Sequence, residues 1–338
     1  MIDTSLRSST KFNPSQLARQ DNDRLNAYRQ NLTFYQGTQW TTASRNRQLV
    51  FNYAKTSIDK ITSYLMQGLG AACYPTAPSR QSAVGSQQSG LTTQDYQLST
   101  ANLNARVRRA EQLLRQVYED NNLQQLDWET EIDAAVLGDA CYKVIWDAEE
   151  KRIRVTAPDI TGVFAWWLGD DMSRVWRVAS RYTLSQDEIV LLYDKTIGKK
   201  SAIITEVWTD KTFDLFLDNA PMESKPNPYG FIPFVIFPNL REPKKFWGTS
   251  DIPGLIQPQR ELNRALSQLS RILELSGNPI AVLENVGTAE DIHVQPGAVW
   301  TIPEDAKAYL LDLLQGGGIR LHIDYIDIIY RTLHDLSE

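Results

Sequence analysis

Apolar residues recur at helical spacing through the first part of the chain. This period predicts helices over residues 14–35, 50–66, 102–119 and 123–137, with Gly138 as the C-terminal stop of the last one. Residues 75–100 are instead rich in Ser, Gln, Thr, Gly and Pro and carry scarcely any charge. Such a composition buries too little apolar area to fix its own conformation, so it predicts a mobile surface loop.

From residue 141 the pattern changes to that of short strands. Segments rich in aromatic and β-branched residues predict strands over 141–146, 153–156, 175–182, 203–208 and 213–217. A helix is predicted at 185–193, where Ser185 and Glu188 have the spacing of a capping box. The apolar run 231–237 contains Pro233, which cannot donate to a ladder. It therefore predicts an edge strand or an extended connector.

The last ninety residues predict two long helices around a small module. Leucines trace one face of a helix from 255 to 275, which Gly277 and Pro279 end. A β-leaning module follows over 279–311. The glycines at 316–318 lack the G-K-[ST] ending of a phosphate loop, so we interpret them as a hinge or helix start. The final helix has the alternating spacing of an a/d seam, formed by Ile319, Ile323, Ile326, Tyr330, Leu333 and Ser337.

Composition narrows the class of protein. The chain has 338 residues, 42% of them hydrophobic and 22% charged, which is ordinary for a folded protein with one large domain or a few modules. Its formal net charge is -6, and residues 249–338 alone hold thirteen Asp and Glu against six Lys and Arg. This acidity disfavours tight neutralisation of nucleic-acid phosphates. Two isolated cysteines, Cys73 and Cys141, suit a reducing compartment, and Cys141 is predicted to be buried.

No residue pattern predicts catalysis, a cofactor or a metal site. The polar N-terminus has no apolar signal region, and no apolar run approaches the roughly 20 residues that span a bilayer. We therefore expect a soluble, non-enzymatic protein that is made in the cytoplasm. The remaining candidate side chains favour structural interpretations. The histidines His293, His322 and His334 are too dispersed for one metal, and Asp170–Asp171 predict a turn. The pair Trp166–Trp167 is predicted to be buried β-core rather than a stacking surface for bases or sugars.

Two blocks of sequence, in a fixed order, resemble a known family. The upstream block is FYQGTQW at 34–40, followed by Arg47 and by NYAKTSIDK at 52–60. The downstream block is NPYGFIPFVIFP at 227–238, followed by FWGTSDIPGLIQPQRELN at 246–263. They resemble the "fYxGxqW…r…N..k..vdk..sYl" and "GxSdi…l…lqd.lN" stretches of the portal proteins of tailed bacteriophages. The resemblance spans roughly residues 20–338.

The resemblance implies an α+β, portal-like fold. Its parts would be an α+β wing over 1–254, a first stem helix over 255–277, a small α/β clip over 278–316 and a second stem helix over 317–338. Portal proteins continue beyond the second stem helix into a tunnel loop and a helical crown. We expect both to be absent from this chain, which ends at Glu338.

The resemblance also implies a function. The family forms a ring, here expected to hold twelve copies, at one capsid vertex, through which double-stranded DNA is packaged and ejected without sequence specificity. Implied partners are the terminase large subunit, a neck or adaptor protein, and the major capsid and scaffolding proteins, with no membrane. The protein would reside in the virion, and in the host cytoplasm during assembly. Two alternatives stay open: another virion neck or adaptor ring, and a hydrolase with an aromatic substrate groove.

The two long helices supply the candidate site residues. Acidic side chains on them would line the channel and repel phosphates: Glu261, Glu274, Asp324, Asp327 and Asp335. Alternatively, these acids face solvent or pair with arginines of a neighbouring copy: Arg264, Arg271, Arg320 and Arg331. Apolar side chains would pack the helices: Leu262, Leu266, Leu269, Ile323, Ile326 and Leu333.

Overall fold

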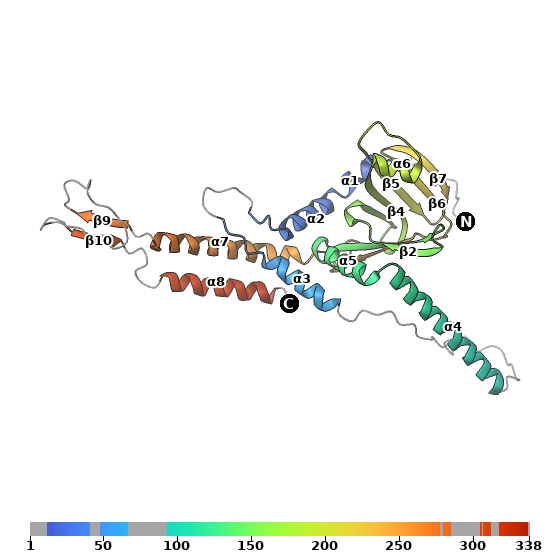
Figure 1. Ribbon diagram of the computed structural model, residues 1–338, viewed down its shortest axis with the longest axis horizontal. Coiled ribbons are helices and arrows are strands. Elements are labelled where there is room, and N and C mark those ends of the chain that lie inside the picture. The colour runs from blue at the N-terminus through green and yellow to red at the C-terminus, as the bar shows by residue number, and fades with distance from the viewer. Residues whose placement is uncertain are drawn as a thin grey trace. The chain divides into compact units, whose positions relative to one another are not determined.

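The computed structural model describes residues 12–40, 48–66, 93–277, 280–284, 305, 307–311 and 318–336. The chain divides into two compact units (Figure 1). One comprises Met1–Leu32 and Ile58–Asp251, and the other comprises Thr33–Ser57 and Ile252–Glu338. Helices and antiparallel strands both contribute extensively to the described residues, which confirms the α+β class.

The N-terminal helices are more broken than the sequence pattern predicts. A 3-10 turn, η2 (Pro14–Gln16), opens the segment because the Asn13 side chain accepts a hydrogen bond from the Ser15 backbone N–H. The short helix α1 (Leu17–Gln20) then ends at Asp21, and α2 (Asn22–Tyr35) begins after it. The next helix, α3 (Tyr53–Leu65), begins three residues after the predicted start at residue 50.

The predicted loop over 75–100 is wrong in its last part. Helix α4 (Thr93–Asp120) begins at Thr93 rather than at 102, so residues 93–100 are helical, while 75–92 lie outside the described residues. Each residue that extends an existing helix adds a hydrogen bond, which outweighs the weak local preference of a polar stretch. Helix α5 (Leu123–Leu137) ends at Gly138, whose left-handed φ of 113° confirms the predicted stop.

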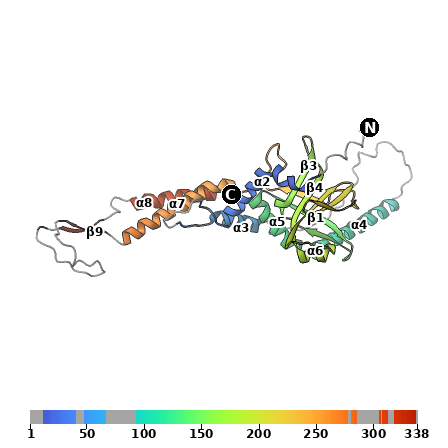
Figure 2. The same ribbon diagram turned by 90° about the horizontal axis from the view of Figure 1, so that it is seen from above.

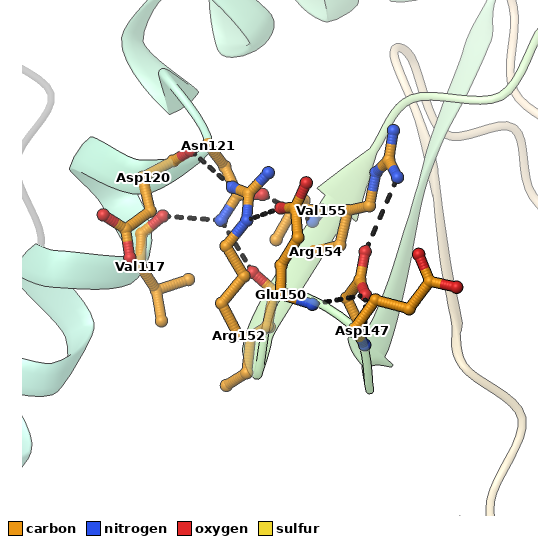
Figure 3. A network of polar contacts seen from close by, with 10 residues as sticks. Val117, Asp120, Asn121, Asp147, Glu150, Arg152, Arg154 and Val155 are labelled. Atoms are coloured by element: carbon orange, nitrogen blue, oxygen red, sulfur yellow. Dashed lines mark hydrogen bonds and ion pairs between the residues drawn. The ribbon is translucent and has the colours of Figure 1, made fainter.

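One amide side chain joins the end of α4 to a sheet edge (Figure 3). Asn121 donates to the Val117 and Ile153 carbonyls and accepts from the Val155 N–H. Ile153 and Val155 belong to an edge strand, whose outer backbone groups would otherwise lack protein partners. Asn121 therefore pairs with this edge much as another strand would.

Two antiparallel sheets follow. The three-stranded sheet has the order β2-β1-β8, with β1 (Asp139–Asp147), β2 (Arg152–Thr156) and β8 (Phe234–Pro238). Among the described residues β8 pairs only with β1, so the run after Pro233 is an edge strand, the first of the two predicted alternatives. The five-stranded sheet runs in sequence order through β3 (Val163–Leu168), β4 (Asp171–Ser185), β5 (Ser201–Thr209), β6 (Thr212–Leu217) and β7 (Ala220–Pro226).

Several local features of the sheets follow from the sequence. The 3-10 turn η4 (Ile160–Gly162) precedes β3. The turn predicted at Asp170–Asp171 lies one residue earlier, at Gly169 and Asp170, and Asp171 is the first residue of β4. No bounds had been predicted for β3, and β7 had not been predicted as a strand. Helix α6 (Gln186–Tyr193) begins with the predicted Ser185–Glu188 capping box. Cys141 is buried in β1, which confirms its prediction.

The tryptophan pair in β3 is only half-buried. Trp166 packs edge-on against Phe12, and Trp167 stacks on Phe246 with ring centroids 4.7 Å apart. Both indole rings are therefore engaged with other aromatic rings of the same unit, in partial agreement with the prediction of buried β-core.

Buried charges also contribute to this unit. Glu206 on β5 is 6% exposed and accepts hydrogen bonds from Lys143, Tyr182 and Trp208. Lys143 lies on β1, so this ion pair joins the three-stranded sheet to the five-stranded one. Burial by itself raises the pKa of Glu206, but the ammonium and the other two donors hold the pKa below its usual value.

Two glycines let distant backbone segments meet. A Cβ on Gly248 would lie 2.5 Å from the Gly138 carbonyl oxygen and 2.6 Å from Pro238 Cβ. At the same junction, the Gly248 N–H donates to the Asp139 carboxylate, and the Ser250 hydroxyl donates to the Ala135 carbonyl. The GTSD segment of the downstream block, residues 248–251, is therefore hydrogen-bonded to the end of α5 and the start of β1.

The second unit contains two long helices and a small strand pair. α7 (Ile252–Gly277) and α8 (Gly318–Asp335) pack side by side and antiparallel (Figures 1 and 2). Between them in sequence, β9 (Ile280–Glu284) pairs antiparallel with β10 (Lys307–Leu311). Residues 285–304 lie outside the described part. In the portion of the chain that the structure describes, no helix combines the length and apolar character of a membrane span.

Candidate functional site

An apolar seam joins α7 to α8. Leu262 and Ala265 of α7 pack with Ile329 of α8, and all three are buried. Leu266 and Ile326 pack against this core, and Leu333 is only 2% exposed. Leu269, another predicted packing residue, is half-buried on α7. The seam is thus built within one chain and fixes the pairing of the two helices.

The face that α8 turns toward α7 is rotated from the predicted seam. Ile329, which the a/d pattern omits, is buried, whereas Ile323 is 52% exposed and Tyr330 is 41% exposed. Ser337 lies outside the described residues. The heptad pattern misses this rotation because a straight helix of 3.6 residues per turn drifts away from a strict seven-residue repeat. Packing of Ile323 therefore stays a prediction about another copy of the chain.

A buried cluster of amide side chains lies on a second face of α7. We call Gln39, Asn52, Gln259 and Asn263 the amide cluster. Asn263 donates to the Gln39 side-chain oxygen at 2.5 Å, and Gln39 donates to the Asn52 side-chain oxygen at 2.8 Å. Gln259 and Asn263 are four residues apart, a spacing that places both on one face of the helix.

The amide cluster also binds the backbone that leads into α3. Asn263 accepts from the Phe51 N–H at 2.9 Å, and Gln259 donates to the Phe51 carbonyl and accepts from the Ala54 N–H. Buried polar groups are costly unless they are paired, and here both the donors and the acceptors of the α7 amides have partners. The cluster therefore holds the segment 49–54 against α7 with directional contacts.

The predicted acidic residues fall into two groups. Glu261 and Asp327 form ion pairs within their own helix, with Arg264 and Arg331. The hydrogen bond from the Arg264 guanidinium lowers the pKa of Glu261, and the Tyr325 hydroxyl also donates to this carboxylate. Glu274 is exposed on α7. Asp324 and Asp335 are exposed on α8 without an ion-pair partner among the described residues.

A groove lies between α7 and α8 beside Trp40. Its volume is about 520 Å³, within the range of roughly 300–1,000 Å³ typical of binding pockets. We call it the Trp40 groove. Its apolar wall contains Trp40, Pro258, Ile328 and Ile329, and its polar lining contains Gln39, Gln257, Arg260, Glu261, Arg264 and Thr332. Ile328 is 61% exposed, so the groove is open to solvent in the single chain.

The opposite flank of α8 also exposes apolar side chains. Ile323 and Tyr330 lie seven residues apart, about two helical turns, and so form a row that we call the Ile323 ridge. Tyr330 touches the Tyr53 ring edge-on, at 5.2 Å between centroids, but keeps much of its surface exposed. α8 therefore presents apolar surface on both sides of its contact with α7.

Comparison with known families identifies the chain. The family model for phage portal protein, SPP1 Gp6-like, matches residues 78–325, which is well over half of the sequence. The chain belongs to this phage portal family. The family is structural and non-enzymatic. No curated protein matches the chain.

The family match includes the downstream block, α7 and the start of α8, up to residue 325, but not the upstream block at 34–60. The amide cluster nevertheless joins the two blocks, because Gln39 and Asn52 come from one and Gln259 and Asn263 from the other. Sequence reasoning used both blocks as a resemblance and missed their contact. The available signal was the pair of amides four residues apart beside the leucine face of α7.

The part of the chain that the structure describes groups no set of side chains suited to a metal. Within the described ranges, no three His, Cys, Asp or Glu side chains converge. His322 and His334 both lie on α8, and His293 lies outside the described residues. The features found in the helix-pair unit are packing surfaces: the seam, the amide cluster, the Trp40 groove and the Ile323 ridge.

Proposed function

We propose that this portal-family chain assembles into a ring, and that double-stranded DNA passes through its central channel during packaging and ejection. The observation that carries the proposal is the placement of apolar side chains on α8. One chain covers the face of α8 that meets α7 and leaves Ile323 and Ile328 exposed on opposite flanks. Two different exposed flanks would be covered by a neighbouring copy on each side, and such a head-to-tail arrangement forms a ring when its rotation closes.

Within this proposal the chain has the parts of a portal subunit. Residues 1–254 form a wing, 255–277 and 317–338 form two stem helices, and 278–316 form a clip. The antiparallel pairing of α7 and α8 supports the stem, and the β9–β10 hairpin-like pair between them in sequence supports a small clip. Twelve copies, the terminase large subunit, a neck or adaptor protein, and the capsid and scaffolding proteins complete the proposed assembly.

The charged face of α8 supports a channel that does not hold DNA tightly. Asp324 and Asp335 are eleven residues apart, about three turns, and both lie on the side of α8 away from the seam. Their carboxylates are not neutralised by a cation among the described residues, whereas Asp327 is paired with Arg331. Negative charge facing DNA opposes adhesion of the phosphate backbone. We therefore assign channel lining first to Asp324 and Asp335.

The test uses the whole chain. Negative-stain microscopy of the wild type should show rings with a central hole. The variant Asp324→Lys/Asp335→Lys should form the same rings but retain linear duplex DNA more strongly in filter binding at low salt, and added salt should weaken this retention. Asp170→Lys/Asp210→Lys makes the same charge change at exposed turns of the sheet unit and serves as the control.

Each outcome separates one part of the proposal. Particles without a hole at every concentration contradict the ring. Rings that retain DNA equally with either double variant contradict the assignment of Asp324 and Asp335, while they leave the ring itself in place.

A further inference from the structure

We infer that the Trp40 groove of one copy receives the Ile323 ridge of the neighbouring copy. This inference rests on the proposed ring and specifies the contact that builds it. The occupant is a second copy of this chain, and the contact joins two different surfaces of the same helix pair.

The shapes of the two surfaces support this pairing. The groove lies between two helices and has a volume of about 520 Å³. The ridge projects two large apolar side chains, Ile323 and Tyr330, two turns apart. On the groove side, Leu321 and Ile328 have the same spacing and are 71% and 61% exposed. Rows with a common repeat can interdigitate when two helices pack.

Charge at the edges of the two surfaces supports the same pairing. Arg260 in the groove donates its Nε–H to the Gln39 carbonyl and faces the Phe34 ring, and it pairs with no carboxylate among the described residues. Asp327 lies beside the ridge, four residues after Ile323 and three before Tyr330. Its exposed pair with Arg331 is of a kind that contributes little, so the carboxylate is available to Arg260 of the neighbour.

The position of the surfaces decides the symmetry of the contact. Groove and ridge occupy opposite flanks of α8, so a copy that uses its ridge on one side keeps its groove for another copy. A two-fold dimer would require one partner to form both groove–ridge contacts at once, and surfaces on opposite flanks of α8 do not allow this. The inferred contact therefore propagates head to tail.

Two exposed positions test the contact without disturbing the seam. Ile323→Glu damages only the ridge, and Ile328→Glu damages only the groove. Both side chains are more than half exposed, at 52% and 61%, so each variant should keep the wild-type circular dichroism and melting curve. Each variant alone should be monomeric by native mass spectrometry at concentrations where the wild type assembles. Leu191→Glu, at an 83% exposed site on α6, is the matched control and should assemble normally.

Mixing the two variants gives the sharpest result. The Ile323→Glu copy has an intact groove, and the Ile328→Glu copy has an intact ridge, so these two surfaces can form one contact. The other ridge and the other groove are both damaged, so no third copy can bind. The expected product is a one-to-one heterodimer. A charge exchange provides a second readout: Arg260→Glu should weaken assembly, and Asp327→Arg in the same chain should restore it.

The outcomes distinguish this inference from the ring itself. If the wild type forms rings and both single variants also do so, the groove–ridge contact is wrong and the ring stands. If the mixed variants stay monomeric, or if one variant still pairs with itself, the head-to-tail contact is likewise wrong. A wild type that remains monomeric at every concentration contradicts the ring and this contact together.

Discussion

Replacing Asn263 with leucine removes the centre of the amide cluster and keeps a side chain of similar size. The Phe51 N–H and the Gln39 side-chain oxygen would then lose the partners that Asn263 now supplies at 2.9 and 2.5 Å. A buried polar group left without a partner costs about 1–3 kcal/mol, so the two together predict roughly 2–6 kcal/mol of local destabilisation. Apolar burial of the leucine offsets part of this cost, which favours the lower half of that range.

Native-state hydrogen exchange is the suitable assay, because a chain of two compact units need not unfold in one step. The Phe51 amide proton should exchange faster in Asn263→Leu. A loss of about 2 kcal/mol corresponds to roughly a thirtyfold increase, given tenfold for every 1.4 kcal/mol. Gln268→Leu, at an exposed position on the same helix, is the control and should leave that rate unchanged.

A double variant separates the cluster from general damage to α7. If Gln39→Leu and Asn263→Leu act through one hydrogen-bonded network, their combined effect on exchange should fall short of the sum of the single effects. Unchanged exchange at Phe51 in Asn263→Leu would refute the idea that the amide cluster holds segment 49–54 to α7.

Two further predictions concern the sheet-containing unit. Gly248→Ala should lower the melting temperature of this unit by an amount equivalent to about 1–3 kcal/mol, because the new Cβ would lie 2.5 Å from the Gly138 oxygen. The control Gly254→Ala, where a Cβ would have no neighbour within 4 Å, should be tolerated. Equal melting curves for the two variants would contradict the close approach at Gly248. Lys143→Met should cost about 3–5 kcal/mol at neutral pH by leaving Glu206 buried without its cation. Since the folded-state pKa of Glu206 lies below its unfolded value, the stabilisation is present above the unfolded pKa of about 4.3 and is lost as pH falls through the folded pKa. The gap between wild type and variant in thermal unfolding should therefore narrow in acid, and a gap independent of pH would contradict this account; Lys195→Met, at an exposed lysine, is the control.

Local sequence signals predicted which helices and strands exist better than they predicted where these elements begin and end. The Ser185–Glu188 capping box and the stop at Gly138 depend on groups within a few residues, and both were confirmed. β7 escaped prediction because its outward side chains are largely exposed and its sequence, APMESKP, lacks the β-branched pattern of a strand. Its pairing with β6 is a tertiary contact that overrides this propensity. The start of α4 was missed for a similar reason, since propagation from a strong helix outweighs polar composition.

The candidate site shows the same division between local and long-range information. Periodicity identified Leu262 and Leu266 on α7, because an apolar face needs only the sequence of one helix. It could not pair Gln39 with Asn263, which are 224 residues apart. Ile326 and Leu333, which were predicted to pack the helices, are both packed within one chain. An acidic substitution at either position would first disturb packing within the single chain, and so would not report on assembly alone.

The sequence of α8 nevertheless contains a signal for assembly once the helix is seen in place. At 100° per residue, the positions from Ile328 round to Ile323 span roughly 220° of the helix surface and are apolar except for Thr332 and His322. The remaining arc holds Arg320, Asp324, Asp327, Arg331, His334 and Asp335. A helix that packs against one partner needs an apolar stripe of about 100°. The seam with α7 accounts for the middle of the wider arc, and its two uncovered margins are the flanks that a neighbouring copy on each side would cover.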